Sequence, residues 1–293
     1  MGKKNKNTAL KSWLRSVRIW QLLGLLVAVM AMRYSYWGHP FHSTPLLESL
    51  FILPILLISA GGNIINDYFD IKEDRSKRPE RALIGRTIKR RVAMMSHWLL
   101  TGAGVALAIL LGSLVDSYIP IIIVLPTAIL LFLYSTWLKK KTIVGNIVVA
   151  GIATAYLPFS LCDVEMHLIG DKYDWFCCMI FTTILIHQIV KDIEDYDVDL
   201  KNGYRTFPIV FSPKSAWILI YIFELWLVFI TKDGITYASS LAFQIIMGTT
   251  LLMTLFFSWR KKTQAVSAWA LLLLLTSLAW MVFFDFDSSY LAS

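Results

Sequence analysis

Long apolar stretches alternate with short polar and charged segments along the whole chain. A helix that crosses a bilayer needs about 20 mostly apolar residues, and nine windows of roughly that length can be recognised. They cover approximately residues 17–36, 46–66, 93–115, 118–138, 143–162, 174–191, 214–231, 239–258 and 264–284. The pattern predicts an all-α, polytopic membrane protein with nine transmembrane helices.

The composition also indicates an integral membrane protein. The 293 residues are 57% hydrophobic and have a mean hydropathy of +0.61, which excludes an ordinary water-soluble domain of this size. No low-complexity tract or linker divides the sequence. We therefore expect a single membrane domain over residues 1–293, with residues 1–16 as a basic cytoplasmic N-terminal segment.

The net charge of +8 suggests a nucleic-acid partner only if the basic residues gather on one surface. Instead they sort by membrane side. The segments that share a side with the N-terminus carry 25 of the 28 Lys and Arg residues, and Arg33, Lys172 and Lys232 lie on the other side. The positive-inside rule then predicts a cytoplasmic N-terminus and an external C-terminus. We expect an integral multi-pass protein, in the inner membrane if bacterial, with no nucleic-acid partner and no implied protein partner.

Two sets of three aspartates share the spacing D-x-x-D-x-x-x-D. Asp67, Asp70 and Asp74 end the second apolar window, and Asp192, Asp195 and Asp199 end the sixth. Both sets fall on the predicted cytoplasmic side, each followed by basic residues and a proline. On an α-helix, positions i, i+3 and i+7 lie within an arc of about 60°. We therefore expect each set to form one acidic stripe on a continuous helix.

Three like charges on one helical face repel each other, so such a stripe favours a bound cation. Carboxylate oxygens are hard ligands that suit Mg²⁺, which usually takes one or two carboxylates and completes its shell with water and substrate phosphate. The two stripes therefore predict Mg²⁺ and a diphosphate, whose charge as a leaving group the metal would neutralise. The alternative is that these are solvated loop acids; two identical sets at two span ends favour the metal.

The phrase from Asn66 to Asp74 resembles the N-D-x-x-D-x-x-x-D signature of UbiA-type intramembrane prenyltransferases, and Lys191 to Asp199 resembles their second motif. A third similar stretch runs from Tyr134 through Lys139 and Lys140 to Asn146. The second motif is most similar to that of geranylgeranylglyceryl-phosphate geranylgeranyltransferases. The resemblance implies nine helices around a central cavity. It also implies Mg²⁺-dependent transfer of a prenyl group from its diphosphate to a lipophilic acceptor in the membrane.

The resemblance also implies roles for individual residues. The catalytic set is Asp67, Asp70, Asp192 and Asp195. The metal set is Asn66, Asp70, Asp74, Asp195 and Asp199. The residues expected to bind the diphosphate are Tyr134, Lys139, Lys140, Lys191, Arg78 and Arg205.

The acceptor is left open by two departures from the subfamily pattern. His187 and Gln188 replace an Arg-Glu pair before the second motif, and Leu83 and Ile84 replace a Pro-Ser pair in the first loop. A glyceryl-phosphate lipid is favoured, with cations such as Arg78, Arg81 or Arg86 for its phosphate. The alternatives are an aromatic acid of quinone synthesis and a UbiA-like terpene cyclase, which needs no acceptor. A transporter is disfavoured because the acids lie at helix ends rather than at the bilayer midplane.

Overall fold

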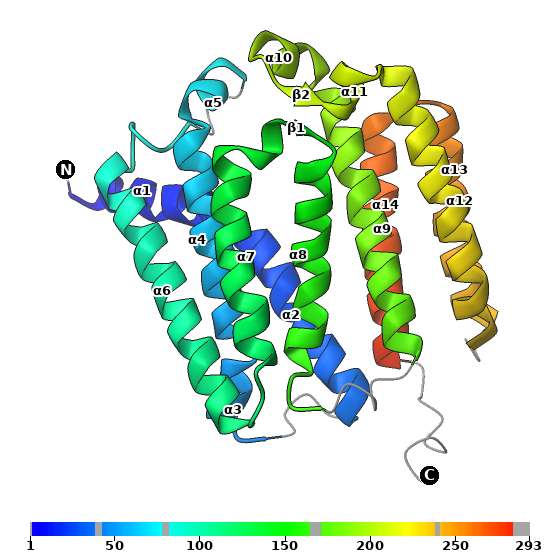
Figure 1. Cartoon of the computed structure of the whole chain (residues 1–293), viewed down its shortest axis with the longest axis horizontal. Coiled ribbons are helices and arrows are strands. Elements are labelled where there is room, and N and C mark those ends of the chain that lie inside the picture. Colours follow the sequence, from blue (N-terminus) through cyan, green and yellow to red (C-terminus); the bar gives the residue numbers. More distant parts are fainter. Residues whose placement is uncertain (1, 39–42, 78–81, 165–170, 238–240, 284–293) are drawn as a thin grey trace. The chain divides into compact units, whose positions relative to one another are not determined.

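A computed structural model describes residues 2–38, 43–77, 82–164, 171–237 and 241–283 (Figure 1). Helices dominate these ranges, with one pair of two-residue strands among them. The chain packs as two units, each described separately below. The first unit comprises Met1–Val29, Phe41–Lys139 and Pro158–Asp163, and the second comprises Met30–Pro40, Lys140–Leu157 and Val164–Ser293.

The regular elements follow one another along the chain, and three of the helices contribute residues to both units. The first unit holds α1 (Gly2–Ser16), residues 19–29 of α2 (Ile19–Trp37), α3 (Pro45–Leu50), α4 (Leu53–Phe69), α5 (Ile71–Lys77), α6 (Arg90–Leu114) and α7 (Ile119–Thr136). The short 3-10 helix η1 (Leu138–Lys140) follows α7. The second unit holds β1 (Lys141–Thr142), most of α8 (Val144–Ser160), α9 (Asp171–Glu194), α10 (Tyr196–Lys201), β2 (Arg205–Thr206), α11 (Phe207–Val210), α12 (Pro213–Tyr237), α13 (Leu241–Trp259) and α14 (Thr263–Phe283).

In the first unit, α4 packs against both α6 and α7 (Figure 1). Glycines allow the close approach, as is common between membrane helices. A Cβ atom at Gly61 would stand 2.8 Å from the Thr101 hydroxyl of α6, and one at Gly62 would stand 2.8 Å from the Leu131 side chain of α7. From the other side, a Cβ atom at Gly104 of α6 would stand 2.9 Å from the Pro54 carbonyl oxygen. The position of α4 is therefore set by close packing at these glycines.

Gly104→Ala tests this packing. The added methyl group meets a backbone oxygen that has little freedom to move, so we expect the free energy of unfolding to fall by about 1–3 kcal/mol. Gly102→Ala is the matched control on the same helix, because no atom lies within 4 Å of the Cβ position there. The control should be neutral or more stable by about 0.5–1 kcal/mol. Thermal unfolding in detergent measures both, and equal melting temperatures would contradict the proposed contact.

A small apolar cluster lies where α4 meets α5, α6 and the loop between them. Its buried members are Ile64, Ile71, Ile84, Ile88 and Ala93. Trp13 and Val17 from the N-terminal segment pack against it. The basic N-terminal segment is thus a helix with a docked apolar edge, and the same cluster holds α5, whose Ile71 is only 6% exposed.

In the second unit, α9 packs against α12 and α14, and α14 packs against α13. Residues three or four positions apart on α9 bury one face of the helix. They include Phe176, Met179, Ile186 and Val190. This face holds α9 in place, so the acidic residues that follow it start from a packed helix.

Each of the nine predicted windows coincides with helical residues in the described part of the chain. Six segments there are long and apolar enough to cross a membrane: Ile19–Trp37, Pro45–Phe69, Arg90–Leu114, Ile119–Thr136, Tyr173–Glu194 and Pro213–Lys232. The described apolar parts of α8, α13 and α14 are shorter. The second window was expected as one helix, but it is interrupted at Phe51 and Ile52. Pro54 explains the break, because it has no N–H to donate to the carbonyl of Leu50.

Candidate active site

The predicted continuous acidic stripe is wrong for both motifs, because each helix is interrupted at its middle aspartate. Asp70 ends α4 with φ −86° and ψ 4°, and Asp195 follows α9 with φ −91° and ψ 3°. The amides of Asp74 and Asp199 still donate to the carbonyls of Asp70 and Asp195, at 2.8 and 2.9 Å. The two motifs therefore share a backbone course as well as a spacing. In each, the third aspartate lies on a separate short helix.

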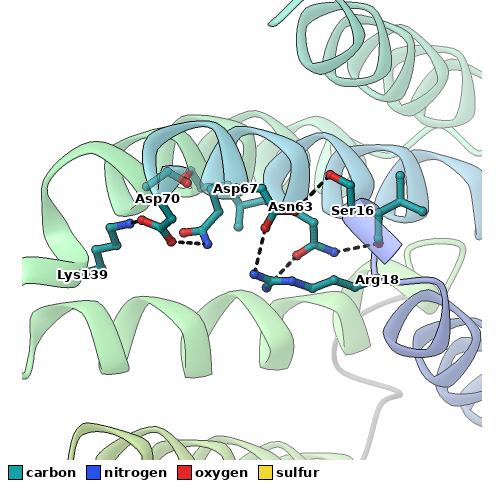
Figure 2. Close-up of polar contacts among 10 residues, drawn as sticks. Ser16, Arg18, Asn63, Asp67, Asp70 and Lys139 are labelled. Atoms are coloured by element: carbon teal, nitrogen blue, oxygen red, sulfur yellow. Dashed lines mark hydrogen bonds and ion pairs between the residues drawn. The ribbon is translucent and has the colours of Figure 1, made fainter. Parts of the chain in front are cut away.

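Asp70 of the first motif is held by a lysine and an asparagine (Figure 2). Its Oδ1 forms an ion pair with the Nζ of Lys139, and its Oδ2 accepts a 2.9 Å hydrogen bond from the Nδ2 of Asn66. The side chains of Lys139 and Asp70 are only 10% and 17% exposed. The ion pair is thus largely withdrawn from water. A lysine and a carboxylate interact more strongly in such a buried setting than at an exposed surface.

Asp67 has other partners, at the junction of α1 and α2. Its Oδ2 accepts from the hydroxyl of Ser16 at 3.0 Å, and its Oδ1 lies 3.5 Å from a guanidinium nitrogen of Arg18. Arg18 also donates to the Oδ1 of Asn63 at 3.2 Å, and the Nδ2 of Asn63 donates to the Val17 carbonyl at 3.0 Å. Figure 2 shows that Asp67 and Asp70 are held by different groups. Arg18 sits at φ 55°, a conformation uncommon for residues other than glycine.

The first motif fits Mg²⁺ that arrives with a diphosphate. The Oδ1 of Asn66 is buried and has no hydrogen-bond partner among the described residues, while its amide nitrogen is fixed on Asp70. This oxygen and the carboxylates of Asp70 and Asp74 are hard donors. Within the described chain, no group of three or more His, Cys, Asp or Glu side chains is arranged to hold a metal alone. Mg²⁺ that keeps water and takes substrate phosphates needs no such cage.

In the second motif, Asp192 has a buried side-chain partner. Its Oδ2 accepts a 2.8 Å hydrogen bond from the Nδ2 of Asn146 near the start of α8. Asn146 is buried, with 8% of its surface exposed. A buried amide that donates to a carboxylate fixes the direction of the second oxygen. Asp195 and Asp199 are half-buried at the start of α10 and within it.

The strand that follows η1 pairs in the second unit with the strand that follows α10. The α10 helix ends at Lys201, and Gly203, which follows it, has φ +70°. The Tyr204 amide donates back to the Asp199 carbonyl at 2.9 Å. The chain then enters β2, which pairs in parallel with β1 and sets Arg205 opposite Lys141. The Nζ of Lys140 lies 5.2 Å from the centre of the Tyr204 ring. The cations Lys140 and Arg205 are therefore exposed neighbours.

The other predicted residues can be placed singly. Tyr134 is half-buried near the end of α7, and Lys191 is exposed in the last turn of α9. Arg78 and Arg81 lie outside the described residues. In the first unit the structure brings Lys139 to Asp70, and in the second it brings Asn146 to Asp192.

Ser16, Arg18 and Asn63 were missed as partners of the first motif. A signal for Asn63 was present, because Asn63 and Asp67 are four residues apart and so share a helical face, just as Asn66 and Asp70 do. No such pattern points to Ser16 or Arg18. Their contact with Asp67 depends on how α1 packs on α4, which spacing along the chain does not reveal.

Residues 22–282 match the model of the UbiA prenyltransferase family. The match spans most of the chain, so the chain belongs to this family. The family expected from the paired acidic motifs is thereby confirmed, and prenyltransferase is the enzyme class that the family description states. Together with the six long apolar helices, membership identifies the chain as an integral, multi-pass membrane protein.

One curated relative is digeranylgeranylglyceryl phosphate synthase of Sulfolobus acidocaldarius, which is 32% identical over 214 residues, or 72% of this chain and 73% of that protein. A solved structure from work on digeranylgeranylglyceryl phosphate synthase in membranes has a TM-score of 0.71 at 21% identity and covers 94% of this chain and 99% of that one. A UbiA homolog from Archaeoglobus fulgidus bound to DMAPP and Mg²⁺ has a TM-score of 0.62 at 16% identity and covers 93% and 100%. At these identities, the two solved structures show the fold.

Proposed function

We propose that this chain transfers a prenyl group from a prenyl diphosphate to a glyceryl-phosphate lipid, with Mg²⁺ as cofactor. The observation that carries the proposal is the environment of Asp70, where a lysine and an asparagine converge on one carboxylate at the end of an apolar helix. A carboxylate and a cation side by side suit a metal-bound diphosphate, because the acid holds the metal and the cation contacts phosphate oxygens. Family membership and the names of the relatives support the same reaction.

In this proposal each motif supplies metal-binding residues and one aspartate that orients the motif. Mg²⁺, when bound, neutralises charge on the departing diphosphate. The residues proposed to hold it are Asn66, Asp70, Asp74, Asp195 and Asp199. Asp67 and Asp192 accept hydrogen bonds from protein donors, which supports a role in orienting the motifs.

Lys139 is the diphosphate-binding lysine that the contacts favour. It is largely buried against Asp70, whereas Lys140 is exposed over a tyrosine ring. Without substrate, Lys139 is paired with Asp70. When the Asp70 carboxylate binds a metal instead, the lysine would be available to contact a phosphate oxygen of the diphosphate. Lys140, Lys191 and Arg205 are proposed as further, weaker contacts of the diphosphate.

The finer arrangement in the membrane is also part of the proposal. We infer nine crossings around a central cavity within a single domain, with the three shorter apolar helices as crossings. The distribution of Lys and Arg supports a cytoplasmic N-terminus and active site and an external C-terminus. In a bacterial cell this would be the inner membrane.

Product analysis tests the function directly. The purified chain is incubated with radiolabelled geranylgeranyl diphosphate, Mg²⁺ and, in separate reactions, a geranylgeranylglyceryl phosphate, hydroxybenzoate or dihydroxynaphthoate. We expect label in the phosphoglycerol lipid and background levels in excess chelator, restored by added Mg²⁺. Preferential labelling of an aromatic acid would overturn the acceptor, and a cyclised hydrocarbon without acceptor would indicate a cyclase. Full turnover in chelator would overturn the metal requirement.

A further inference from the structure

A basic pocket lies in the first unit between α1 and the loop that precedes α6. Its volume is about 300 Å³. It is lined by Lys11, Ser12 and Arg15 from α1 and by Leu83, Arg86 and Thr87 from the loop. Three of the side chains are cationic, two carry a hydroxyl group, and none is acidic. The polar side chains of the pocket can thus all donate to an anion, and Ala82 and Leu83 contribute apolar surface.

The positive charge of this basic pocket is not balanced locally on α1. Lys11 and Arg15 are exposed, stand one helical turn apart, and pair with no carboxylate among the described residues. Two further cations lie against Gly85 of the same loop: a Cβ atom at Gly85 would stand 3.3 Å from a guanidinium nitrogen of Arg75 and 3.5 Å from one of Arg90. Cations held this close repel each other, so an anion in the pocket is favoured.

The loop side of the pocket is a rigid wall. The amides of Arg86, Thr87 and Ile88 all donate to the Leu83 carbonyl at 3.2, 2.9 and 3.1 Å, and Ile84 and Ile88 are buried in the apolar cluster beneath. Gly85 takes φ +84°, a conformation that suits glycine. Because those amides are already engaged, an anion would be bound by side chains, and a phosphate is well matched to lysine, arginine and hydroxyl donors.

The α1 helix carries an apolar edge beside the basic pocket. Leu10 and Leu14 are 60% and 40% exposed, while Ser12 and Ser16 face the protein. On a helix, Leu14 and Lys11 are neighbours, so the exposed leucines border the basic residues. A helix with exposed leucines next to lysine and arginine is typical of one that lies in the membrane interface. The pocket therefore stands where lipid headgroups are concentrated.

We propose that this basic pocket binds the phosphate of a lipid headgroup. The lipid is either an anionic phospholipid of the surrounding membrane or the glyceryl-phosphate acceptor, and both present the same phosphate ester. Ser12 precedes Ser16 by one turn, about 6 Å along the helix axis, and Ser16 donates to Asp67 of the first motif. A lipid phosphate in the pocket would thus stabilise the α1 segment that holds Asp67.

Equilibrium binding tests the site without turnover, so its outcome is independent of the proposed function. The full chain in neutral detergent, without Mg²⁺ or prenyl diphosphate, is titrated calorimetrically with dioctanoyl phosphatidic acid, dioctanoylglycerol or inorganic phosphate. The variant Lys11→Gln/Arg15→Gln should bind phosphatidic acid about tenfold more weakly or worse. Arg86→Gln should act in the same direction from the loop side. The matched control, Lys261→Gln/Lys262→Gln, removes the same charge after α13 and should stay within about twofold.

Two results would overturn the proposal. One is equal affinity for phosphatidic acid in all variants, with unchanged melting temperatures. The other is inorganic phosphate that binds as tightly as phosphatidic acid, which would remove the lipid from the proposal. The source of the phosphate is assigned by a second arm with active protein in phosphatidylcholine nanodiscs. If the acceptor occupies the pocket, its KM rises about tenfold in the double variant and phosphatidic acid competes with it; if a membrane lipid does, the acceptor KM is unchanged. Either pattern supports the phosphate site.

Discussion

Asp70→Asn is expected to lower kcat for prenyl transfer by about a hundred- to a thousandfold, in the range seen when a group that stabilises transition-state charge is removed. The substitution keeps the size of the side chain and its acceptor oxygen toward Asn66. It removes the charge that pairs with Lys139 and that would bind the metal. The loss should appear in kcat at saturating Mg²⁺ and prenyl diphosphate, measured by single-turnover and steady-state assays.

Asp67→Asn should cost far less, about tenfold or below, because Asp67 is occupied by Ser16 and Arg18 and an asparagine oxygen can still accept from either. Asp197→Asn is the control, since Asp197 is an exposed acid of α10 that is not one of the six regularly spaced aspartates; it should leave kcat unchanged. A ranking in which Asp67→Asn is as harmful as Asp70→Asn would refute the division of roles between the two acids. Equal melting temperatures of the variants would exclude misfolding as the cause.

Lys139→Met is expected to lower kcat/KM for the prenyl diphosphate by about a hundredfold. An ammonium group that contacts a departing diphosphate stabilises its negative charge, and methionine fills similar space without a charge. At the same time Asp70 loses its ion-pair partner, so Mg²⁺ no longer competes with a lysine for that carboxylate. The concentration of Mg²⁺ needed for half-maximal activity should therefore not rise, while the KM for the diphosphate should.

Lys72→Met serves as the control, since Lys72 is an exposed lysine on α5 beside the same motif. It should change kcat/KM by no more than about twofold. If Lys139 had a purely structural role, Lys139→Met would change the melting temperature. The KM for the diphosphate would then not rise relative to the Mg²⁺ concentration needed for half-maximal activity. Unchanged kinetics in Lys139→Met would mean that Lys140 or another cation, and not Lys139, contacts the diphosphate.

The helical elements and the chemistry of the acidic motifs could be predicted from the sequence because both are local. Apolar windows of about 20 residues mark spans, and identical spacing marked Asp67 to Asp74 and Asp192 to Asp199 as equivalent. The break of each helix at its middle aspartate was not predictable from periodicity. Spacing alone does not distinguish a continuous helix from two helices whose hydrogen bonds pass through one residue with ψ near 0°, as at Asp70 and Asp195.

Contacts between distant segments account for most of what could not be predicted. The partners Ser16 and Arg18 reach Asp67 from 51 and 49 residues away, through packing of α1 on α4. The interruption before Pro54 was open to prediction, because proline inside an apolar window breaks the backbone ladder. The pairing of Lys139 with Asp70, 69 residues apart, was not predicted, because the resemblance indicated only a diphosphate contact for Lys139 and no rule of local structure leads to the pair.

The apolar cluster under α5 changes how the departure at Leu83 and Ile84 is interpreted. A seven-residue helix such as α5 is not stable in water by itself, so Asp74 keeps its place through the burial of Ile71 beside Ile84 and Ile88. Ile84, 1% exposed, is thus an anchor for the helix that carries the proposed metal ligand Asp74. The isoleucine at this position is explained by its packing beneath α5, so this departure from the subfamily pattern carries no information about which acceptor is used.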